Sequence, residues 1–251
     1  MSRRPLLAGN WKMNLTLDES VALAVKVAES ADKYQDRDVM IAPAFTALQS
    51  VKGALAGSPV FLASQNICWA QQGAFTGDIS PLMLKELDVS MAIIGHSERR
   101  QLFFEDDAMI NRRVKGALAN DIIPVLCLGE TLEEREANRT FAVLSRQLQD
   151  GLAGCTLEEV KKIVFAYEPV WAIGTGKTAT REQAQEVHTF LRELIAEKFE
   201  KTLAGGVRIL YGGSVKPDNI DALIAQPDID GVLVGGAALN YESFSRIIAF
   251  T

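Results

Sequence analysis

Residues 122–169 read IIPVLCLGETLEEREANRTFAVLSRQLQDGLAGCTLEEVKKIVFAYEP and contain two short apolar runs, at 122–128 and 163–167. Both runs are continuous rather than alternating, as in strands that are buried on both faces of a parallel sheet. Between the runs, Thr131 and Thr156 each stand three residues before a glutamate, which is the capping box that begins a helix. The stretch therefore predicts two parallel strands joined by a helical crossover.

The same unit recurs along the whole chain. Short apolar runs occupy residues 6–9, 39–42, 60–63, 91–95, 122–128, 163–167, 208–212 and 231–235. Two more capping boxes pair Thr16 with Glu19 and Thr180 with Gln183, the second at the start of a segment, 181–200, with helical spacing.

Eight such units fit one closed α/β architecture, a (β/α)8 barrel with eight parallel strands, for which ~250 residues is typical. An open doubly wound sheet is the alternative, but it usually has fewer strands and often has a glycine-rich turn after the first strand, where this chain has Asn-Trp-Lys. Because no linker or compositional shift interrupts the chain, we expect a single barrel domain over residues 1–251.

The composition and net charge of the chain disfavour some classes of binding partner. The chain has 251 residues, of which 48% are hydrophobic and 23% charged, as in ordinary globular proteins. Lys and Arg number 26 against 32 Asp and Glu, and the net charge of −6 argues against nucleic acid or an acidic membrane as partner. No apolar stretch approaches eighteen residues, so we expect no membrane-spanning helix.

The cysteine content indicates a reducing compartment. Three cysteines, Cys68, Cys127 and Cys155, are widely spaced, form no C-x-x-C motif and are accompanied by only two histidines. A disulfide framework and a Cys/His zinc site are both disfavoured, and we expect no metal. The N-terminal apolar run is too short for a secretory signal, so the sequence predicts a cytoplasmic protein.

Polar residues follow most of the predicted strands, where parallel α/β folds bind their ligands. In chain order they are Asn10 and Lys12, Gln65 and Asn66, His96, Cys127 and Glu130, Glu168, Gly212-Gly213-Ser214, and Gly235-Gly236. We predict that the functional site is built from this set.

The two glycine-rich turns, at 212–214 and 235–236, indicate a phosphate site. Glycine lets backbone N–H groups approach an anion, and barrels often bind phosphate after their seventh and eighth strands. A tight-turn role would explain one such pair, but two pairs on adjacent units favour phosphate.

Three side chains are candidates for the chemistry. His96 stands at a strand end, unlike His188, which shares a helical stripe and is expected to be packed or solvated. Glu168 follows an apolar strand, where partial desolvation is expected to raise its pKa toward that of a general base, with a buried ion pair as the alternative. Lys12 is placed to meet an anion rather than only solvent. Cys127 has apolar neighbours and is expected to pack.

These residues suggest proton abstraction beside a carbonyl in a small phosphorylated substrate. Residues 169–179 have Pro and Trp at one end and Gly, Thr and Lys at the other, which is typical of a loop that closes over a ligand.

Seven segments together resemble the triosephosphate isomerase family. They are GNWKMN (9–14), GAFTGD (73–78), IIGHSERR (93–100), PVLCLGE (124–130), AYEPVWAIGTGKTAT (166–180), YGGSV (211–215) and GVLVGGAAL (231–239). The resemblance implies interconversion of dihydroxyacetone phosphate and D-glyceraldehyde 3-phosphate through an enediolate, in glycolysis and gluconeogenesis, with no cofactor or metal. Ala238 departs from the family's usual serine, but the neighbouring glycines are retained.

The resemblance also implies a role for each site residue. Glu168 matches the base that removes the carbon-bound proton, and Lys12 matches the cation that faces the developing negative charge. His96 matches the neutral imidazole that polarises the carbonyl and shuttles protons between the oxygens. Asn10 matches a substrate contact, and Glu98 and Cys127 match supporting residues. The phosphate-binding positions are matched by Gly174, Ser214, Gly235 and Gly236.

A subunit contact is implied as well. In the loop 71–79, Phe75 is expected to be exposed at an uncharged tip. By resemblance, the loop inserts into a second copy of the chain, where Thr76 lies near the partner's active-site region, and the protein is a homodimer.

Two other function classes predict different residues. A catalytically silent phosphate-binding barrel is expected to lack Glu168, His96 or Lys12, and all three are present. An aldolase or an indole-type lyase would need a Schiff-base lysine or a second carboxylate at a strand end, and we find neither.

Overall fold

A computed structural model of the chain describes residues 3–172 and 179–251. Its centre is a closed barrel of parallel strands in which each strand pairs with the next and β8 pairs with β1. The strands are β1 (Leu6–Asn10), β2 (Asp38–Ala42), β3 (Phe61–Ser64), β4 (Met91–Ile94), β5 (Ile123–Leu128), β6 (Val164–Tyr167), β7 (Ile209–Tyr211) and β8 (Gly231–Val234). The predicted (β/α)8 barrel is confirmed, and closure between β1 and β8 excludes the open sheet.

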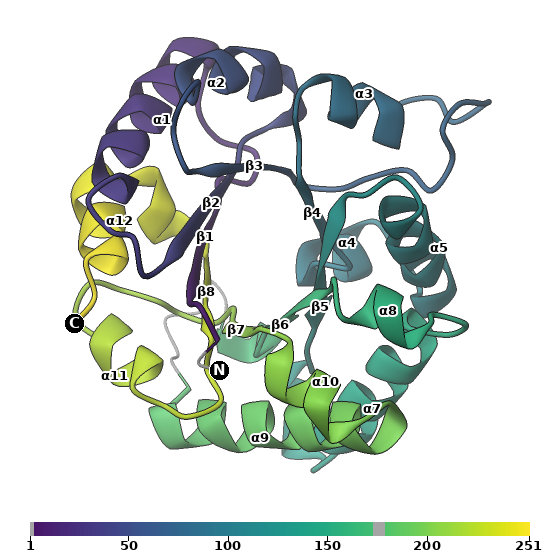
Figure 1. Cartoon of the computed structure of the whole chain (residues 1–251). Helices are drawn as coiled ribbons and strands as arrows, with labels where there is room; N and C mark the ends of the chain where they lie inside the picture. The colour runs from purple at the N-terminus through teal and green to yellow at the C-terminus, as the bar shows by residue number, and fades with distance from the viewer. Residues whose placement is uncertain (1–2, 173–178) are drawn as a thin grey trace.

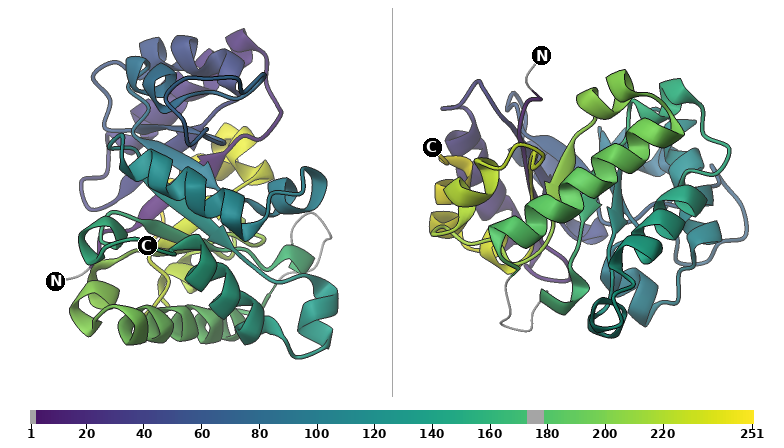
Figure 2. Two further views of the ribbon diagram at one scale, coloured as in Figure 1. Left: turned by 90° about the vertical axis from the view of Figure 1, so that its right-hand side faces the viewer. Right: turned by 90° about the horizontal axis from the view of Figure 1, so that it is seen from below.

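The crossovers between the strands are helical. The α-helices are α1 (Leu17–Ala31), α2 (Leu48–Ala54), α3 (Pro81–Glu86), α4 (Ser97–Leu102), α5 (Asp107–Leu118), α6 (Leu132–Glu136), α7 (Thr140–Gly151), α8 (Leu157–Val160), α9 (Arg181–Lys198), α10 (Lys201–Gly206), α11 (Ile220–Ile224) and α12 (Tyr241–Ile248). The 3-10 turns are η1 (Phe45–Ala47), η2 (Val170–Ala172) and η3 (Gly236–Leu239). Figure 1 looks through the barrel and shows the helices as a ring around the strands, and Figure 2 shows the same ring from two further sides.

Every predicted strand lies within one residue of its observed bounds at either end, and all four predicted capping boxes are present. The strands were recognisable because both of their faces are buried. The inner face fills the barrel with Leu6, Ala8, Met40, Ala42, Ala63, Met91, Ile93, Val125, Cys127, Val164, Ala166, Leu210 and Leu233. The outer face, which includes Leu7, Ile41 and Phe165, packs against the helices.

Within residues 3–172 and 179–251, no helix has both the length and the apolar character needed to cross a membrane.

Candidate functional site

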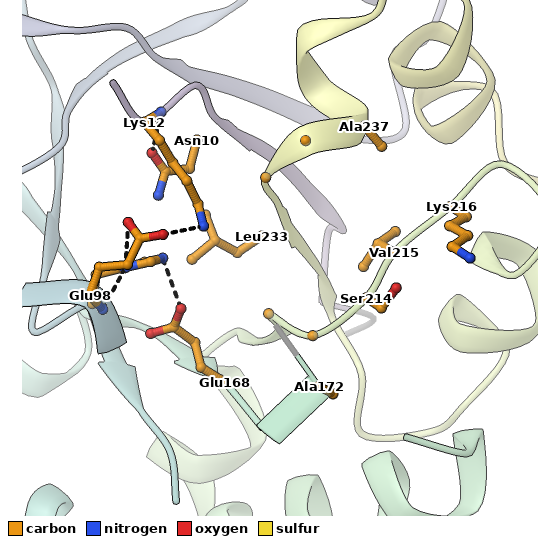
Figure 3. Close-up of a pocket in the computed structure, with 15 residues that line it drawn as sticks. Asn10, Lys12, Glu98, Glu168, Ala172, Ser214, Val215, Lys216, Leu233 and Ala237 are labelled. Carbon is orange, nitrogen blue, oxygen red and sulfur yellow. Dashed lines mark hydrogen bonds and ion pairs between the residues drawn. The ribbon is translucent and has the colours of Figure 1, made fainter. Parts of the chain in front are cut away.

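A pocket of about 470 Å³ lies at the carboxyl ends of the strands. Its lining, within the described ranges, consists of Asn10, Lys12, His96, Glu98, Glu168, Ala172, Gly212, Gly213, Ser214, Val215, Lys216, Leu233, Gly235, Gly236 and Ala237. In Figure 3, Lys12, Glu98 and Glu168 lie on one side of the pocket, and Ser214, Val215 and Lys216 lie across from them.

The pocket brings together the predicted catalytic residues and most of the predicted binding residues. Gly174, the remaining phosphate-site prediction, lies outside the described residues, as does most of the predicted loop 169–179. Four other strand-end residues, Gln65, Asn66, Cys127 and Glu130, are absent from the pocket's lining within the described ranges.

Glu168 is the buried acid of the site, with 2% of its surface exposed. Its Oε1 lies 2.9 Å from Nε2 of His96, and its Oε2 accepts the backbone N–H of Ser97 at 3.0 Å. The Ser97 hydroxyl lies 3.4 Å from Oε1. The carboxylate that follows β6 is therefore held by residues that follow β4.

The pKa of Glu168 corrects an expectation from the sequence. Burial alone raises the pKa of this carboxyl, but the charge and hydrogen bond of His96 and the N–H of Ser97 outweigh burial, so its pKa is lowered. Burial likewise opposes charge on His96, yet the Glu168 carboxylate prevails and raises the pKa of His96. The sequence indicated the buried position, but not the partner that reverses the effect of burial.

His96 is oriented by the helix that follows it. It is the N-cap of α4, and its Nδ1 accepts the backbone N–H of Glu98 at 3.2 Å. An Nδ1 that accepts a hydrogen bond leaves the proton of a neutral imidazole on Nε2, which points at Glu168. His96 thus caps α4, and the next residue, Ser97, contacts Glu168.

Lys12 has a strained backbone, with φ at +54°, which non-glycine residues rarely adopt. Two amide side chains hold it: Asn10 Oδ1 accepts its N–H at 3.1 Å, and Gln65 donates to its carbonyl at 2.7 Å. Its Nζ lies 2.6 Å from Oε1 of Glu98. Gln65 therefore acts on the site through the backbone of Lys12, a role that the sequence did not reveal.

The opposite wall contains the glycine-rich turns. A Cβ on Gly212 would lie 2.9 Å from Cγ of Glu168, and one on Gly213 would lie 2.2 Å from the hydroxyl of Tyr211. Glycine is needed at these two positions so that the turn after β7 can lie against Glu168 and Tyr211. Lys216, two residues after Ser214, adds a cation to the lining that sequence reasoning missed.

Besides Gln65, two more of the strand-end residues outside the lining have supporting positions. Glu130 is fully buried, and its Oε1 accepts from Tyr167, Trp171 and Arg135 at 3.1, 2.9 and 3.1 Å. It thus anchors η2, directly after Glu168 and Pro169. Cys127 packs inside the barrel as predicted, where burial and then the charge of Glu168 raise the pKa of its thiol.

His188 is packed rather than catalytic, as predicted. It is fully buried, with Nδ1 3.2 Å from the carbonyl of Asp228, and burial lowers its pKa to about 4. No group of three or more His, Cys, Asp or Glu in the described part of the chain is placed to hold a metal ion.

Comparison with known proteins gives a consistent result. A family model described as triosephosphate isomerase matches residues 5–251. The triosephosphate isomerase of Syntrophotalea carbinolica is 53% identical over 248 residues, which cover 99% of this chain and 98% of that protein. Those of Pelobacter propionicus and Carboxydothermus hydrogenoformans are each 51% identical, over 248 and 246 residues, covering 99% and 98% of both chains. Because the match spans nearly the whole barrel and includes every strand end that forms the pocket, the chain belongs to the triosephosphate isomerase family.

Proposed function

We propose that the protein is an aldose–ketose isomerase that interconverts dihydroxyacetone phosphate and D-glyceraldehyde 3-phosphate, a step of glycolysis and gluconeogenesis. One observation carries this proposal. The buried carboxylate of Glu168 and the imidazole of His96 lie within hydrogen-bonding distance of each other, in a pocket that also contains the ammonium group of Lys12. An acid, a base and a cation around one small cavity suit proton transfer next to a carbonyl.

In the proposed reaction, Glu168 removes a proton from the carbon beside the substrate's carbonyl. The negative charge that develops on the carbonyl oxygen is stabilised by the Nε2–H of His96 and by Lys12. Because an enediolate carries more charge on oxygen than the ketone does, these donors stabilise the transition state more than the bound substrate. His96 moves the hydroxyl proton from one oxygen of the enediolate to the other, and Glu168 returns a proton to the adjacent carbon, which leaves the carbonyl group on the neighbouring carbon.

The phosphate group is proposed to lie against Ser214, Gly235 and Gly236, with Gly174 as a further contact. Gly235 and Gly236 line this side of the pocket, where their backbone N–H groups would bind the phosphate, and Lys216 adds a cation to the same lining as Ser214. Asn10 is proposed to contact the substrate while it holds the backbone of Lys12. Local donors can thus bind a dianion in spite of the chain's net charge of −6.

The proposed reaction needs neither a cofactor nor a metal. One carbon is oxidised and its neighbour is reduced within the same molecule, so no external electron acceptor is required. Proton transfers and hydrogen bonds from the residues named above account for every step.

We further propose a cytoplasmic homodimer of single barrel domains, each formed by residues 1–251. In the loop 71–79, Phe75 is 37% exposed, and Met13, next to Lys12, is 94% exposed. A second copy of the chain would cover these apolar side chains. The family resemblance supports Thr76 as the contact with the partner's active-site region.

A coupled assay tests the activity. Purified protein is mixed with D-glyceraldehyde 3-phosphate, and the dihydroxyacetone phosphate formed is reduced by an NADH-dependent dehydrogenase. We expect NADH consumption in proportion to the amount of protein and independent of added chelator. A folded protein that consumes no NADH at any protein concentration would contradict the proposed function.

A further inference from the structure

Arg100, in α4, spans the ends of two neighbouring strands. Its Nε donates to the carbonyl of Gly95 at 2.8 Å, and its Nη2 donates to the carbonyl of Cys127 at 3.2 Å. Gly95 directly follows β4, and Cys127 is the penultimate residue of β5. A single guanidinium group therefore joins β4 to β5 at the rim of the barrel.

The backbone at this point needs such donors. The register of β4 with β5 ends at Ile94 and Leu126, so the Gly95 and Cys127 carbonyls lie beyond the last paired residues. Gly95 has φ at +72°, which turns the chain out of the sheet and toward α4. Buried backbone carbonyls require partners, and the rigid fork of an arginine can serve two at once.

The peptide that Arg100 holds leads straight into the catalytic contacts. His96, Ser97 and Glu98 follow Gly95, and they contact Glu168 at 2.9 and 3.0 Å and Lys12 at 2.6 Å, respectively. The Nδ1 of His96 accepts the N–H of Glu98 from within this same short segment, so the backbone of residues 95–98 also carries the contact that orients the ring. A shift of the Gly95 carbonyl would move all three contacts together.

The carboxylate of Asp107 is a third partner of the Arg100 guanidinium group. Asp107, buried in the first turn of α5, accepts from Nη1 of Arg100 at 2.6 Å and from Nη1 of Arg146 at 2.6 Å. Arg146 is 56% exposed at its side chain and bonds neither strand-end carbonyl, so the two arginines share a partner but not a position. A cavity of about 250 Å³, lined by Ser97, Arg100, Asp107 and Arg146 among others, gives small cations a route to this site.

We propose that Arg100 is a positioning residue for His96: by bonding the carbonyls of Gly95 and Cys127, it fixes the backbone that aims the imidazole at Glu168 and the substrate. The consequence for catalysis rests on the proposed isomerase function, whereas the effect on the position of His96 does not. The test therefore has one part that measures position and another that measures turnover.

Position is measured by NMR of ¹⁵N-labelled histidine. The chain has only two histidines, and His188 is a buried internal reference bonded to the Asp228 carbonyl. Arg100→Ala is expected to shift the ring resonances of His96 and leave those of His188 in place. Unchanged His96 resonances in the folded variant would overturn the proposal, whether or not the protein proves to be an isomerase.

Turnover is measured in parallel. A catalytic group displaced by about 1 Å can cost on the order of 10²-fold in rate, so Arg100→Ala is expected to lower kcat by about that factor, with KM changed less than about threefold. Arg146→Ala, which removes the other cation on Asp107, is the control and should keep the wild-type kcat.

Chemical rescue separates positioning from general destabilisation. Millimolar guanidinium is expected to raise the kcat of Arg100→Ala at least about tenfold, because the free ion can occupy the place of the missing side-chain guanidinium and donate to both carbonyls. Methylammonium should raise it little. Guanidinium would only inactivate a variant that was merely destabilised, and that result would overturn the proposal. If Arg100→Ala does not fold, Arg100→Lys carries the test: its ammonium pairs with Asp107 but cannot span both carbonyls, so the His96 shift is still expected.

Discussion

Nε2 of His96 lies 2.9 Å from Oε1 of Glu168, so the proposed base and the proposed electrophile are hydrogen-bonded to each other. This contact lowers the pKa of Glu168 against the effect of burial and raises that of His96. A substrate carbonyl that takes the His96 proton removes the partner that stabilises the charged carboxylate. In the proposed reaction, substrate binding should therefore make Glu168 a stronger base when it faces the carbon-bound proton.

Replacing Lys12 is expected to affect binding as well as chemistry. Lys12→Met removes a cation that both the bound phosphate ester and the enediolate experience, so KM should rise and kcat/KM should fall on the order of 10²-fold or more. Steady-state kinetics in the coupled assay measures both. A variant with a lowered kcat and an unchanged KM would contradict this prediction, because Lys12 would then act only on the transition state and not on the bound substrate.

A substitution at Gly129, which directly follows β5, tests whether this residue helps to position Glu168. A Cβ at this position would lie 1.8 Å from the backbone oxygen of Glu168, so Gly129→Ala must displace Glu168. We expect a loss of kcat on the order of 10²-fold and a loss of about 1–3 kcal/mol in the free energy of unfolding.

The matched control for Gly129 is Gly53, in α2, where an added Cβ meets nothing within 4 Å. Gly53→Ala should leave kcat unchanged and stabilise the fold by about 0.5–1 kcal/mol. Wild-type kcat in Gly129→Ala would show that the position of Glu168 does not depend on this contact.

Because His188 is buried, we expect the folded protein to lose stability in mild acid. Burial lowers its pKa to about 4, against about 6.5 in the unfolded chain. As the pH falls from about 6.5 to 4, the unfolded state binds a proton that the folded state does not, which costs the fold about 3 kcal/mol.

Urea unfolding at pH 7 and at pH 5 measures this effect against His188→Gln, whose amide can keep the contact with the Asp228 carbonyl. The variant should lose less stability between the two pH values than the wild type does. Equal losses in both proteins would mean that His188 does not contribute to the acid sensitivity.

The exposed apolar side chains of Met13 and Phe75 lead us to expect a homodimer in solution. Sedimentation equilibrium at micromolar concentration should give twice the chain mass of 27.4 kDa. Phe75→Glu should lower both the mass and the activity, because it places a charge where a second copy of the chain is expected to pack. Val25→Lys, an equally exposed position on α1, is the control and should stay dimeric. A wild-type monomer with full activity would refute the proposed homodimer.

The barrel could be predicted from the sequence because its signals are local. Runs such as 122–128 are continuous since both faces of the strand are buried, and the box of Thr131 with Glu134 is complete within four residues. The supporting contacts are not local. Arg100 bonds the carbonyl of Cys127, 27 residues away, and the pKa of Glu168 depends on His96, which reaches it from another strand.

The candidate site residues could also be located from local signals in the sequence. The residues that contact them in the folded chain could not. Glu168 and His96 stand out at strand ends, but nothing in the residues around Lys216 distinguishes it from a surface lysine. Gln65 was visible as a polar residue after β3, whereas its bond to the Lys12 carbonyl requires the closed barrel. The sequence pattern indicates where the site lies. The contacts that hold its side chains depend on which strand ends the closed barrel brings together.

The most direct test of the account is the isomerase activity of Glu168→Gln measured beside Glu168→Asp and the wild type. The amide cannot accept a proton, so Glu168→Gln should lose nearly all activity while still folding and binding inorganic phosphate at the Ser214 side of the pocket. Glu168→Asp keeps the charge but shortens the side chain by one methylene, and it should lose on the order of 10²-fold in kcat with little change in KM. Wild-type activity in Glu168→Gln would contradict the account, because the base would then be a different residue.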